Sequence, residues 1–425
     1  MFVFEEQLLN SSNNQGILSQ NSLFWWEKDR QKTISLNDVV CVSACNDTRN
    51  LISFVVSSYP LVQNRFSKPR RKLQEYHFIC PSIAVRSRWL QALNNQLYPQ
   101  HLQTSRRHLQ ILLNPYSGRK NAAQIFVQIE PLFAKSNLSY TLSETKEIGD
   151  AKLQAKMLDI SQIDGLVVVG GDGTIHEVVN GLMSRDDWET AIKTPIGIIP
   201  AGTGNGLCKS LLAIAGEPYD LISAAFLIAK GQKYPIDVGM VEQNNQRYYS
   251  LLSVSWALPS DVDIESEKLR YFGSLRNLIY GLWRICFLRS YQGQFSFLPA
   301  TDSQPQTWQI ITGNFVLFWA MNSPWTTYDL NVAPLASLND GKIDVLIIRE
   351  GISRLQLLLA FFLLYSANGS HLRLPEIEYY QVTQFSLEMF EIQGNLAIDG
   401  EVFSISSLKF SLFKKLVSFF FFSGF

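Results

Sequence analysis

The chain has no excess of charge of either sign. Among its 425 residues, 37 lysines and arginines balance 37 aspartates and glutamates. A strongly basic composition would indicate a nucleic-acid partner, so this balance gives no support for one. The five cysteines, at positions 41, 45, 80, 208 and 286, show no paired metal-ligand spacing. An odd, scattered set of cysteines suits a reducing compartment.

Long hydrophobic runs are missing as well. The run at 355–364 has about ten mostly apolar residues, roughly half of what spans a bilayer, and the Phe-rich C-terminal tail is similarly short. The first residues, with Glu5 and Glu6, lack the basic and apolar regions of a secretory signal. We therefore expect a cytoplasmic protein that associates with membranes peripherally and transiently.

The composition nevertheless supports several packed cores, because 46% of the residues are hydrophobic. Residues 1–100 contain several β-rich runs and then one helical segment, 82–97, that carries Trp89. This order resembles a pleckstrin-homology domain. The basic segment 68–72 in this part fits either contact with anionic lipid or a solvated loop.

The rest of the chain divides into two further parts. From 108 to 235, short apolar strands alternate with helices, which predicts an α/β domain with a doubly wound parallel sheet. From 236 to 425, strands predominate and predict an antiparallel β-sandwich with helical insertions at 273–288 and 353–366. The second insertion is apolar nearly all round, which favours a core position over a wall or gate for a lipid tail.

The most informative stretch is the turn Gly170-Gly171-Asp172-Gly173-Thr174. It follows the apolar run 165–169 and precedes a helical pattern at 175–183, with Thr174 and Glu177 in a capping-box arrangement. Glycines before a helix let backbone N–H groups approach a phosphate. Asp172 could then bind Mg²⁺ or accept a proton from a hydroxyl group, although a tight turn with a capping aspartate is the simpler alternative.

A second glycine turn, Pro200-Ala201-Gly202-Thr203-Gly204-Asn205-Gly206, follows the next predicted strand, 195–199. Turns after parallel strands lie at the edge of the sheet where open α/β folds bind ligands. The chain lacks Walker A spacing, but the strand before Asn114 ends in a Gly/Ser/Lys-containing loop, 115–120. Together, these blocks resemble the diacylglycerol kinase catalytic-domain superfamily, whose nucleotide-binding fold is shared with NAD kinases.

The acidic segment 260–273, Ser-Asp-Val-Asp-Ile-Glu-Ser-Glu-Lys-Leu-Arg-Tyr-Phe-Gly, narrows the resemblance to sphingosine kinases. By itself it could be a solvated turn that leads into a helix. A sphingoid base carries an ammonium group beside its hydroxyls, so a carboxylate such as Asp263 can pair with the cation. Diacylglycerol and ceramide offer no such charge.

The resemblance implies an ATP- and Mg²⁺-dependent kinase that phosphorylates the primary hydroxyl of sphingoid bases. Asp172 would be its catalytic residue, either as the general base or by orienting the hydroxyl. It implies nucleotide contacts from Asn114, Pro115, Tyr116, Thr145, Lys146, Glu147, Ile148, Gly149, Glu177, Thr203, Gly204, Asn205, Arg270, Arg276, Asp399, Gly400 and Glu401. It implies contacts to the lipid head from Gly170, Gly171, Asp172, Gly173 and Asp263. The first loop contains less glycine than in many relatives, which weakens its match.

Two alternatives stay open at this point. One is a diacylglycerol or ceramide kinase, and the other is a catalytically idle lipid-binding adaptor. The intact Asp172 and both glycine turns argue against the adaptor. The acidic segment argues against an NAD kinase, and the oligomeric state does not follow from the sequence.

Overall fold

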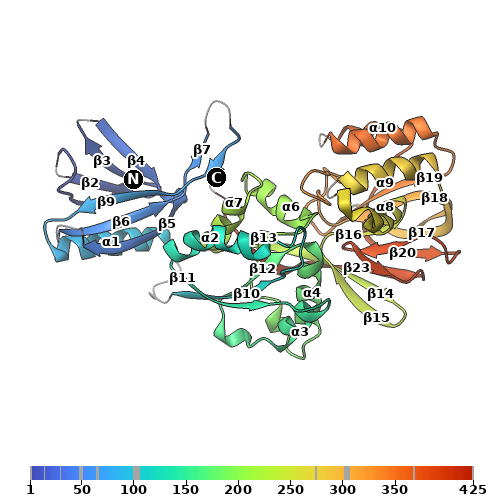
Figure 1. Ribbon diagram of the computed structural model, residues 1–425, viewed down its shortest axis with the longest axis horizontal. Coiled ribbons are helices and arrows are strands. Elements are labelled where there is room, and N and C mark those ends of the chain that lie inside the picture. Colours follow the sequence, from blue (N-terminus) through green and yellow to red (C-terminus); the bar gives the residue numbers. More distant parts are fainter. Residues whose placement is uncertain are drawn as a thin grey trace.

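The computed structural model describes residues 2–13, 15–28, 30–46, 51–63, 67–98, 106–272, 275–300, 307–366 and 369–423. Three parts follow one another along the long axis of the molecule: a β-rich N-terminal unit, an α/β part and a β-sandwich (Figure 1). The fold class predicted from the sequence is confirmed.

The N-terminal unit has two antiparallel sheets closed by one helix. Its strands are β1 (Phe2–Gln7), β2 (Gln15–Ser19), β3 (Ser22–Glu27), β4 (Arg30–Ser35), β5 (Val39–Asn46), β6 (Ile52–Ser58), β7 (Leu61–Val62), β8 (Arg70–Arg71) and β9 (Gln74–Ile79). β1 to β4 form one sheet, β5, β6 and β9 form the second, and β7 and β8 make a small ribbon. Helix α1 (Ile83–Leu97) begins after Ser82, whose hydroxyl accepts the N–H of Val85, and it buries Trp89 completely.

The α/β part contains a parallel sheet with helices on both faces. Its strands, in spatial order, are β11 (Leu138–Glu144), β10 (Arg107–Leu113), β12 (Gly165–Gly170) and β13 (Ile196–Pro200). Its helices are α2 (Ala122–Lys135), α3 (Asp150–Met157), α4 (Asp172–Met183), α5 (Trp188–Ala191), α6 (Gly206–Ile214) and α7 (Leu221–Lys230). β12 and β13 are buried along their whole length, as expected for central strands covered on both faces.

Two helices depart from what local sequence rules favour. Helix α2 continues through Pro131, although a proline commonly ends or kinks a helix. The carbonyl that this proline leaves without a helical partner belongs to Val127, a residue that is 63% exposed, so water can bind the carbonyl. Helix α4 begins at Asp172 rather than after Thr174, because Gly171 takes the extended N-cap conformation and no side chain caps the helix.

The sandwich is antiparallel, as predicted. Its strands are β14 (Gln232–Gln243), β15 (Gln246–Ser250), β16 (Ser253–Ala257), β17 (Tyr291–Pro299), β18 (Gln309–Met321), β19 (Ile343–Arg349), β20 (Glu378–Met389), β21 (Leu396–Ile398), β22 (Glu401–Phe403) and β23 (Leu408–Phe421). Its core is rich in aromatic rings, with Phe295, Phe318 and Phe385 packed in one cluster.

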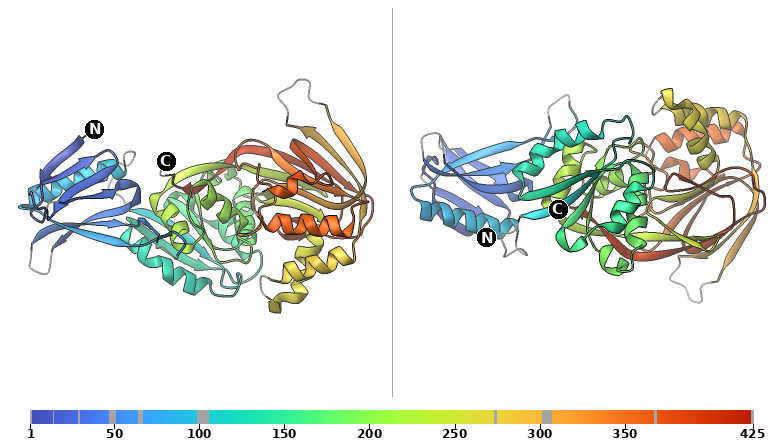
Figure 2. Two further views of the ribbon diagram at one scale, coloured as in Figure 1. Left: turned by 90° about the horizontal axis from the view of Figure 1, so that it is seen from above. Right: turned by 60° about the horizontal axis from the view of Figure 1, so that its bottom comes forward.

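The C-terminal strand joins the sandwich to the α/β part. β23 pairs with β20 and β14 and then runs from the sandwich into the α/β part (Figure 2). There it reaches β13, where Phe419 lies opposite Ile196. The side chains of residues 419–422 are buried in the α/β core. The Phe-rich tail is therefore a strand, and both parts share one sheet among the described residues. The division at residue 236 stays a prediction.

The acidic segment, which by itself could have been a solvated turn, is helical. It forms α8 (Leu258–Glu265) and the 3₁₀ segment η3 (Ser266–Phe272), and α9 (Leu275–Cys286) follows. Helix α10 (Arg354–Tyr365) lies beside α9 and buries only one face, so the core position predicted for it is only half right (Figure 1). In the part of the chain that the structure describes, no helix has the length and apolarity needed to cross a membrane.

Candidate active site

Three glycine-containing turns lie against one another at the carboxyl edge of the parallel sheet. They are the turns that follow β10, β12 and β13. A Cβ added at Gly202 would lie 2.5 Å from the Cα of Gly171, and one at Gly118 would overlap the carbonyl oxygen of Ala201. The absence of side chains therefore permits this close approach of three backbones. The two turns expected to share an edge do so, and the first loop joins them.

Asp172 lies in the first turn of α4, and the start of α6 holds its carboxylate. Oδ2 accepts the N–H of Gly206 at 2.9 Å, and Oδ1 accepts the N–H of Leu207 at 3.2 Å. Burial raises the pKa of Asp172 to about 6, although these backbone donors act in the opposite direction. A carboxylate with a pKa near neutrality is suited to accept a proton from a hydroxyl group.

Helix α4 also fixes the first turn and the 145–149 segment. The Nδ2 of Asn114 donates to the hydroxyl of Thr174 at 2.9 Å, so Thr174 serves this contact instead of capping the helix. The Oε1 of Glu177 accepts the N–H of Gly149 at 2.9 Å instead of closing a capping box. Both predicted roles in capping were therefore wrong, because these side chains connect neighbouring turns.

Asn205 organises the second glycine turn from a left-handed conformation, with φ of 57°. Its Oδ1 accepts the N–H of Gly202 at 3.0 Å and its Nδ2 donates to the carbonyl of the same residue at 2.7 Å. The carbonyl of Gly204 accepts the N–H of Tyr328 at 2.8 Å. The turn is thus closed by its own side chain and braced by a segment from the sandwich.

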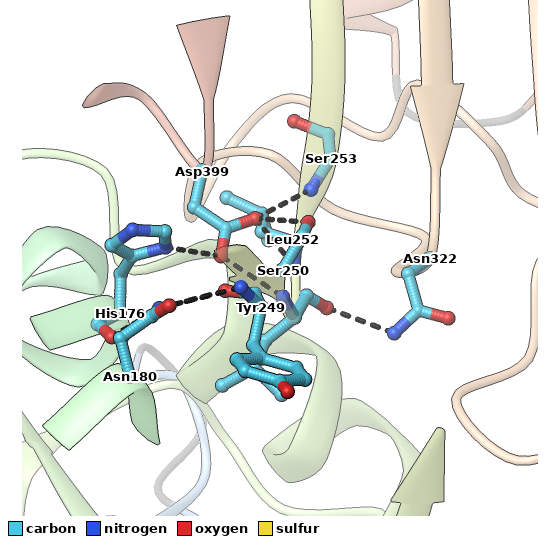
Figure 3. Close-up of polar contacts among 9 residues, drawn as sticks. His176, Asn180, Tyr249, Ser250, Leu252, Ser253, Asn322 and Asp399 are labelled. Carbon is cyan, nitrogen blue, oxygen red and sulfur yellow. Dashed lines mark hydrogen bonds and ion pairs between the residues drawn. The ribbon is translucent and has the colours of Figure 1, made fainter. Parts of the chain in front are cut away.

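Asp399 is the centre of a buried polar network (Figure 3). Its carboxylate accepts bonds from the hydroxyl of Ser250, the N–H groups of Leu251, Leu252 and Ser253, and the Nδ1 of His176. Burial alone would raise the pKa of Asp399, but His176 and these donors hold it below its usual range. With five protein partners, Asp399 anchors the turn between β21 and β22, and direct contact of its carboxylate with nucleotide stays a prediction.

The turn between β21 and β22 lies between the glycine turns and the acidic segment. Asp399 and Gly400 both have positive φ, 53° and 85°, as in a type I′ turn. On one side, a Cβ added at Gly173 would overlap the Oε1 of Glu401. On the other side, one at Gly400 would lie 3.5 Å from the Oδ2 of Asp263. The carboxylate of Asp263 and the glycine turn of Asp172 are therefore neighbours of the same short turn.

Asp263 sits among charges of both signs. Burial raises its pKa to about 6, the guanidinium of Arg276 lowers it, and the carboxylates of Glu267 and Glu401 raise it further. Arg276 forms an ion pair with Glu267 and keeps 13% of its side chain exposed. Because the pKa of this carboxyl group is raised, an organic cation that binds beside it would stabilise its charged form.

The site residues predicted from the sequence differ in exposure. Those exposed are Tyr116, Lys146, Glu147, Ile148, Thr203, Gly400 and Glu401, and those buried or half-buried are Asn114, Pro115, Thr145, Gly149, Gly170, Gly171, Gly173, Glu177, Gly204, Asn205, Asp263, Arg276 and Asp399. The backbone of Arg270 belongs to η3, but its side chain lies outside the described residues.

The side chains at this site fit a magnesium ion that binds together with the nucleotide. They fit less well a metal ion held by the protein alone. Among the described residues, no cluster of three or more His, Cys, Asp or Glu side chains is placed to hold a metal. Mg²⁺ commonly binds phosphates and water with one or two carboxylates. Glu401 fits that role, because partial burial and the nearby acids Glu177, Asp399 and Glu267 raise its pKa.

Sequence reasoning missed several residues that position the site. The N–H groups of Gly206 and Leu207 hold Asp172, but a backbone donor leaves no signal in a sequence beyond the start of a helix. Asn395 donates to Asp261 at 2.8 Å and to Glu265 at 3.1 Å, and an asparagine that follows a glycine in the sequence indicates only a turn. His176, on α4, also supports the site from within the fold, because its Nδ1 bonds the carboxylate of Asp399.

Comparison with known families agrees with this geometry. Residues 108–241 match the diacylglycerol kinase catalytic domain, and residues 261–418 match the YegS C-terminal NAD kinase beta sandwich-like domain. The crystal structure of a diacylglycerol kinase from Bacillus anthracis aligns with a TM-score of 0.51 and 19% identity. The alignment covers 75% of this chain and 98% of that one, and at this identity it supports the fold alone.

Curated relatives give the family. Sphingosine kinase 2 of Arabidopsis thaliana is 36% identical over 334 residues, which cover 70% of this chain and 69% of the relative. Human sphingosine kinase 1 is 31% identical over 326 residues, covering 69% of this chain and 85% of the relative. The resemblance seen in the sequence is confirmed, and the chain belongs to the sphingosine kinase family of lipid kinases.

Proposed function

We propose that this protein transfers the γ-phosphoryl group of ATP to the primary hydroxyl of a sphingoid long-chain base. The observation that carries this proposal is the placement of the carboxylates of Asp172 and Asp263 on either side of the β21–β22 turn. A Cβ added at Gly173, next to Asp172, would overlap the Oε1 of Glu401, and one added at Gly400 would lie 3.5 Å from the Oδ2 of Asp263. One acid can therefore act on a hydroxyl group while the other binds the neighbouring ammonium group.

The chemical step follows from the position of Asp172. The hydroxyl oxygen of the lipid attacks the γ-phosphorus, and its proton passes to the Asp172 carboxylate. The bond between the γ-phosphorus and the bridging oxygen breaks, and ADP leaves with that oxygen. The backbone N–H groups of Gly206 and Leu207 keep the carboxylate oriented during the transfer.

The nucleotide would lie along the three glycine turns, where backbone N–H groups can approach the phosphates. Asn114, the 145–149 segment held by Glu177, and the turn closed by Asn205 support this position. Arg276 and Arg270 would neutralise phosphate charge. Mg²⁺, when bound with ATP, would supply further neutralisation of phosphate charge, and Glu401 is the protein carboxylate that would hold it.

We propose transient, peripheral contact with a membrane as the route to the lipid, and a cytoplasmic location. Exposed apolar side chains on and beside two adjacent helices support this route: Leu275, Ile279, Trp283 and Phe287 at α9, and Leu355, Leu359 and Phe362 on α10. Five free cysteines agree with a reducing compartment. For the N-terminal unit we propose a pleckstrin-homology-like fold, on the basis of its four-stranded and three-stranded sheets followed by one helix.

The test is phosphorylation of sphingosine, ceramide and diacylglycerol by one preparation with labelled ATP. We expect transfer to sphingosine at least about tenfold faster than to the neutral lipids, because a charge-assisted hydrogen bond contributes about 1.5–3 kcal/mol. Asp263→Ala should reduce kcat/KM for sphingosine most. Equal losses on all three lipids would refute the ion pair, and preferred transfer to a neutral lipid would replace the proposed substrate.

A further inference from the structure

The N-terminal unit is joined to the α/β part by a buried ion pair. The guanidinium of Arg71, on β8, binds both oxygens of Glu217: Nε to Oε2 at 2.8 Å and Nη2 to Oε1 at 2.5 Å. Each of these side chains keeps only 5% of its surface exposed. Arg71, expected from the sequence in a basic segment that meets lipid or solvent, is therefore an internal residue.

Further contacts fix the guanidinium from both sides of this interface. Its Nη1 donates to the Oδ1 of Asp38 at 2.8 Å and to the carbonyl of Tyr59, both in the N-terminal unit. Its Cζ lies 3.7 Å from the centre of the Phe226 ring on α7. A planar, bidentate and stacked arrangement of this kind is specific for arginine, since lysine cannot reproduce it.

Glu217 is part of the C-terminal cap of α6. Gly216, with φ of 71°, ends the helix in the left-handed conformation, and its N–H donates to the carbonyl of Ala213. The N–H of Glu217 donates to the carbonyl of Leu212 at 2.8 Å, which completes a Schellman motif. Arg71 therefore grips a residue whose backbone is fastened to the last turn of α6.

The other end of α6 holds the catalytic carboxylate. The helix has nine residues and so extends about 14 Å from Gly206, whose N–H binds Asp172, to its C-terminal cap. A short helix moves as a unit, and the hydroxyls of Ser210 and Ser323, 2.6 Å apart, pin it near its middle. Release of one end would therefore tilt the other.

We propose that Arg71 is a positioning residue for the phosphoryl transfer. Through Arg71 and helix α6, the N-terminal unit fixes the position of the Asp172 carboxylate. This inference rests on the proposed kinase function. Asp399, Cys208 and Tyr219 are titratable neighbours of Asp172, and all three lie outside the N-terminal unit. Removal of Arg71 would thus act on Asp172 through the geometry of α6.

The experiment compares Arg71→Ala and the milder Glu217→Gln with Lys135→Ala. Lys135 makes a second ion pair with the N-terminal unit, to Glu75 at 2.8 Å, but from α2, so it is a matched control. We expect both test variants to lose about 10- to 100-fold in kcat with little change in KM, since small misplacements of a reacting group are costly. In both variants, the acid limb of the pH profile of kcat should move to higher pH. The backbone N–H groups lower the pKa of Asp172, so their loss should raise it. Arg71→Lys should recover only part of the activity.

Hydrogen exchange of residues 206–212 provides a readout that does not depend on activity. We expect faster exchange there in Glu217→Gln than in Lys135→Ala, when each variant is measured at the same interval below its own melting temperature. If Arg71→Ala does not fold, Glu217→Gln decides. Parent-like kcat, acid limb and exchange in that variant would overturn the inference. A parent protein without kinase activity would refute the proposed function, and the exchange rates would still decide whether Arg71 acts on α6.

Discussion

The two sides of helix α8 carry aspartates two residues apart in very different surroundings. Asp261 is fully buried, and its carboxylate receives the guanidinium of Arg284 at 2.6 Å, the hydroxyl of Tyr291 at 2.7 Å and the amide of Asn395 at 2.8 Å. Asp263 faces the β21–β22 turn, and burial raises its pKa to about 6.

The same contrast separates Asp399 from Asp172. The carboxylate of Asp399 has five hydrogen-bond donors and a lowered pKa. The carboxylate of Asp172 is bonded by the N–H groups of Gly206 and Leu207, and its pKa is raised to about 6. Acids with full sets of partners hold the fold together. Acids that the protein leaves short of stabilisation are suited to take a proton or a cation from a substrate.

The largest effect should come from removing the proton acceptor. Asp172→Asn keeps the shape of the side chain but cannot accept the hydroxyl proton, so we expect kcat to fall by about 10²–10⁴-fold. Steady-state kinetics with sphingosine would measure this, and lipid binding should persist. Asp187→Asn, at an exposed ion pair with Arg185, is the control and should keep parent turnover. Unchanged turnover in Asp172→Asn would remove Asp172 from the mechanism.

On the other side of the comparison, Asp261→Asn should reduce stability. It leaves the buried guanidinium of Arg284 without its counter-charge, which costs about 3–5 kcal/mol of the free energy of unfolding. Urea unfolding measures the loss. The double variant Asp261→Asn with Arg284→Met should recover much of it, because no unpaired charge then stays buried. A loss below about 1 kcal/mol would mean that this acid is not structural.

The smallest effect is expected for Asp263→Asn, which should raise the stability of the protein instead of lowering it. The raised pKa of Asp263 means that the folded protein binds this proton more tightly than the unfolded chain. Its contribution to stability therefore falls as pH rises from about 4 to 6, and the penalty persists above pH 6. Because Asp263 stays partly exposed, we expect Asp263→Asn to stabilise the protein by about 1–2 kcal/mol at pH 7.5. Melting temperatures that differ equally at pH 4 and pH 7.5 would contradict this explanation.

Much of the secondary structure could be predicted from residues that are close together in the sequence. The helical segment predicted at 82–97 agrees with α1, which Ser82 caps, and Asp220 and Gly231 bound α7 as an N-cap and a left-handed C-cap. The Ser353–Gln356 capping box marks the start of α10. These signals depend on neighbours within four residues, which is why a sequence reveals them.

Long-range pairing was not readable. The Phe-rich tail gave no sign that β23 crosses from the sandwich to the α/β sheet, because its partners are β14, β20 and β13. In the same way, nothing near Arg71 in the chain indicates Glu217, which lies 146 residues away. Strand order and ion pairs between distant segments depend on the whole fold.

The sequence by itself determined the glycine turns, the acids at 172 and 263 and the alternation of strands and helices, because spacing and residue type carry that information. The tertiary structure alone decided which acids were satisfied and which were left short of partners. Solvation and charge at a carboxylate depend on groups from distant segments, so Asp261 and Asp263 look alike in the sequence and differ in the folded protein.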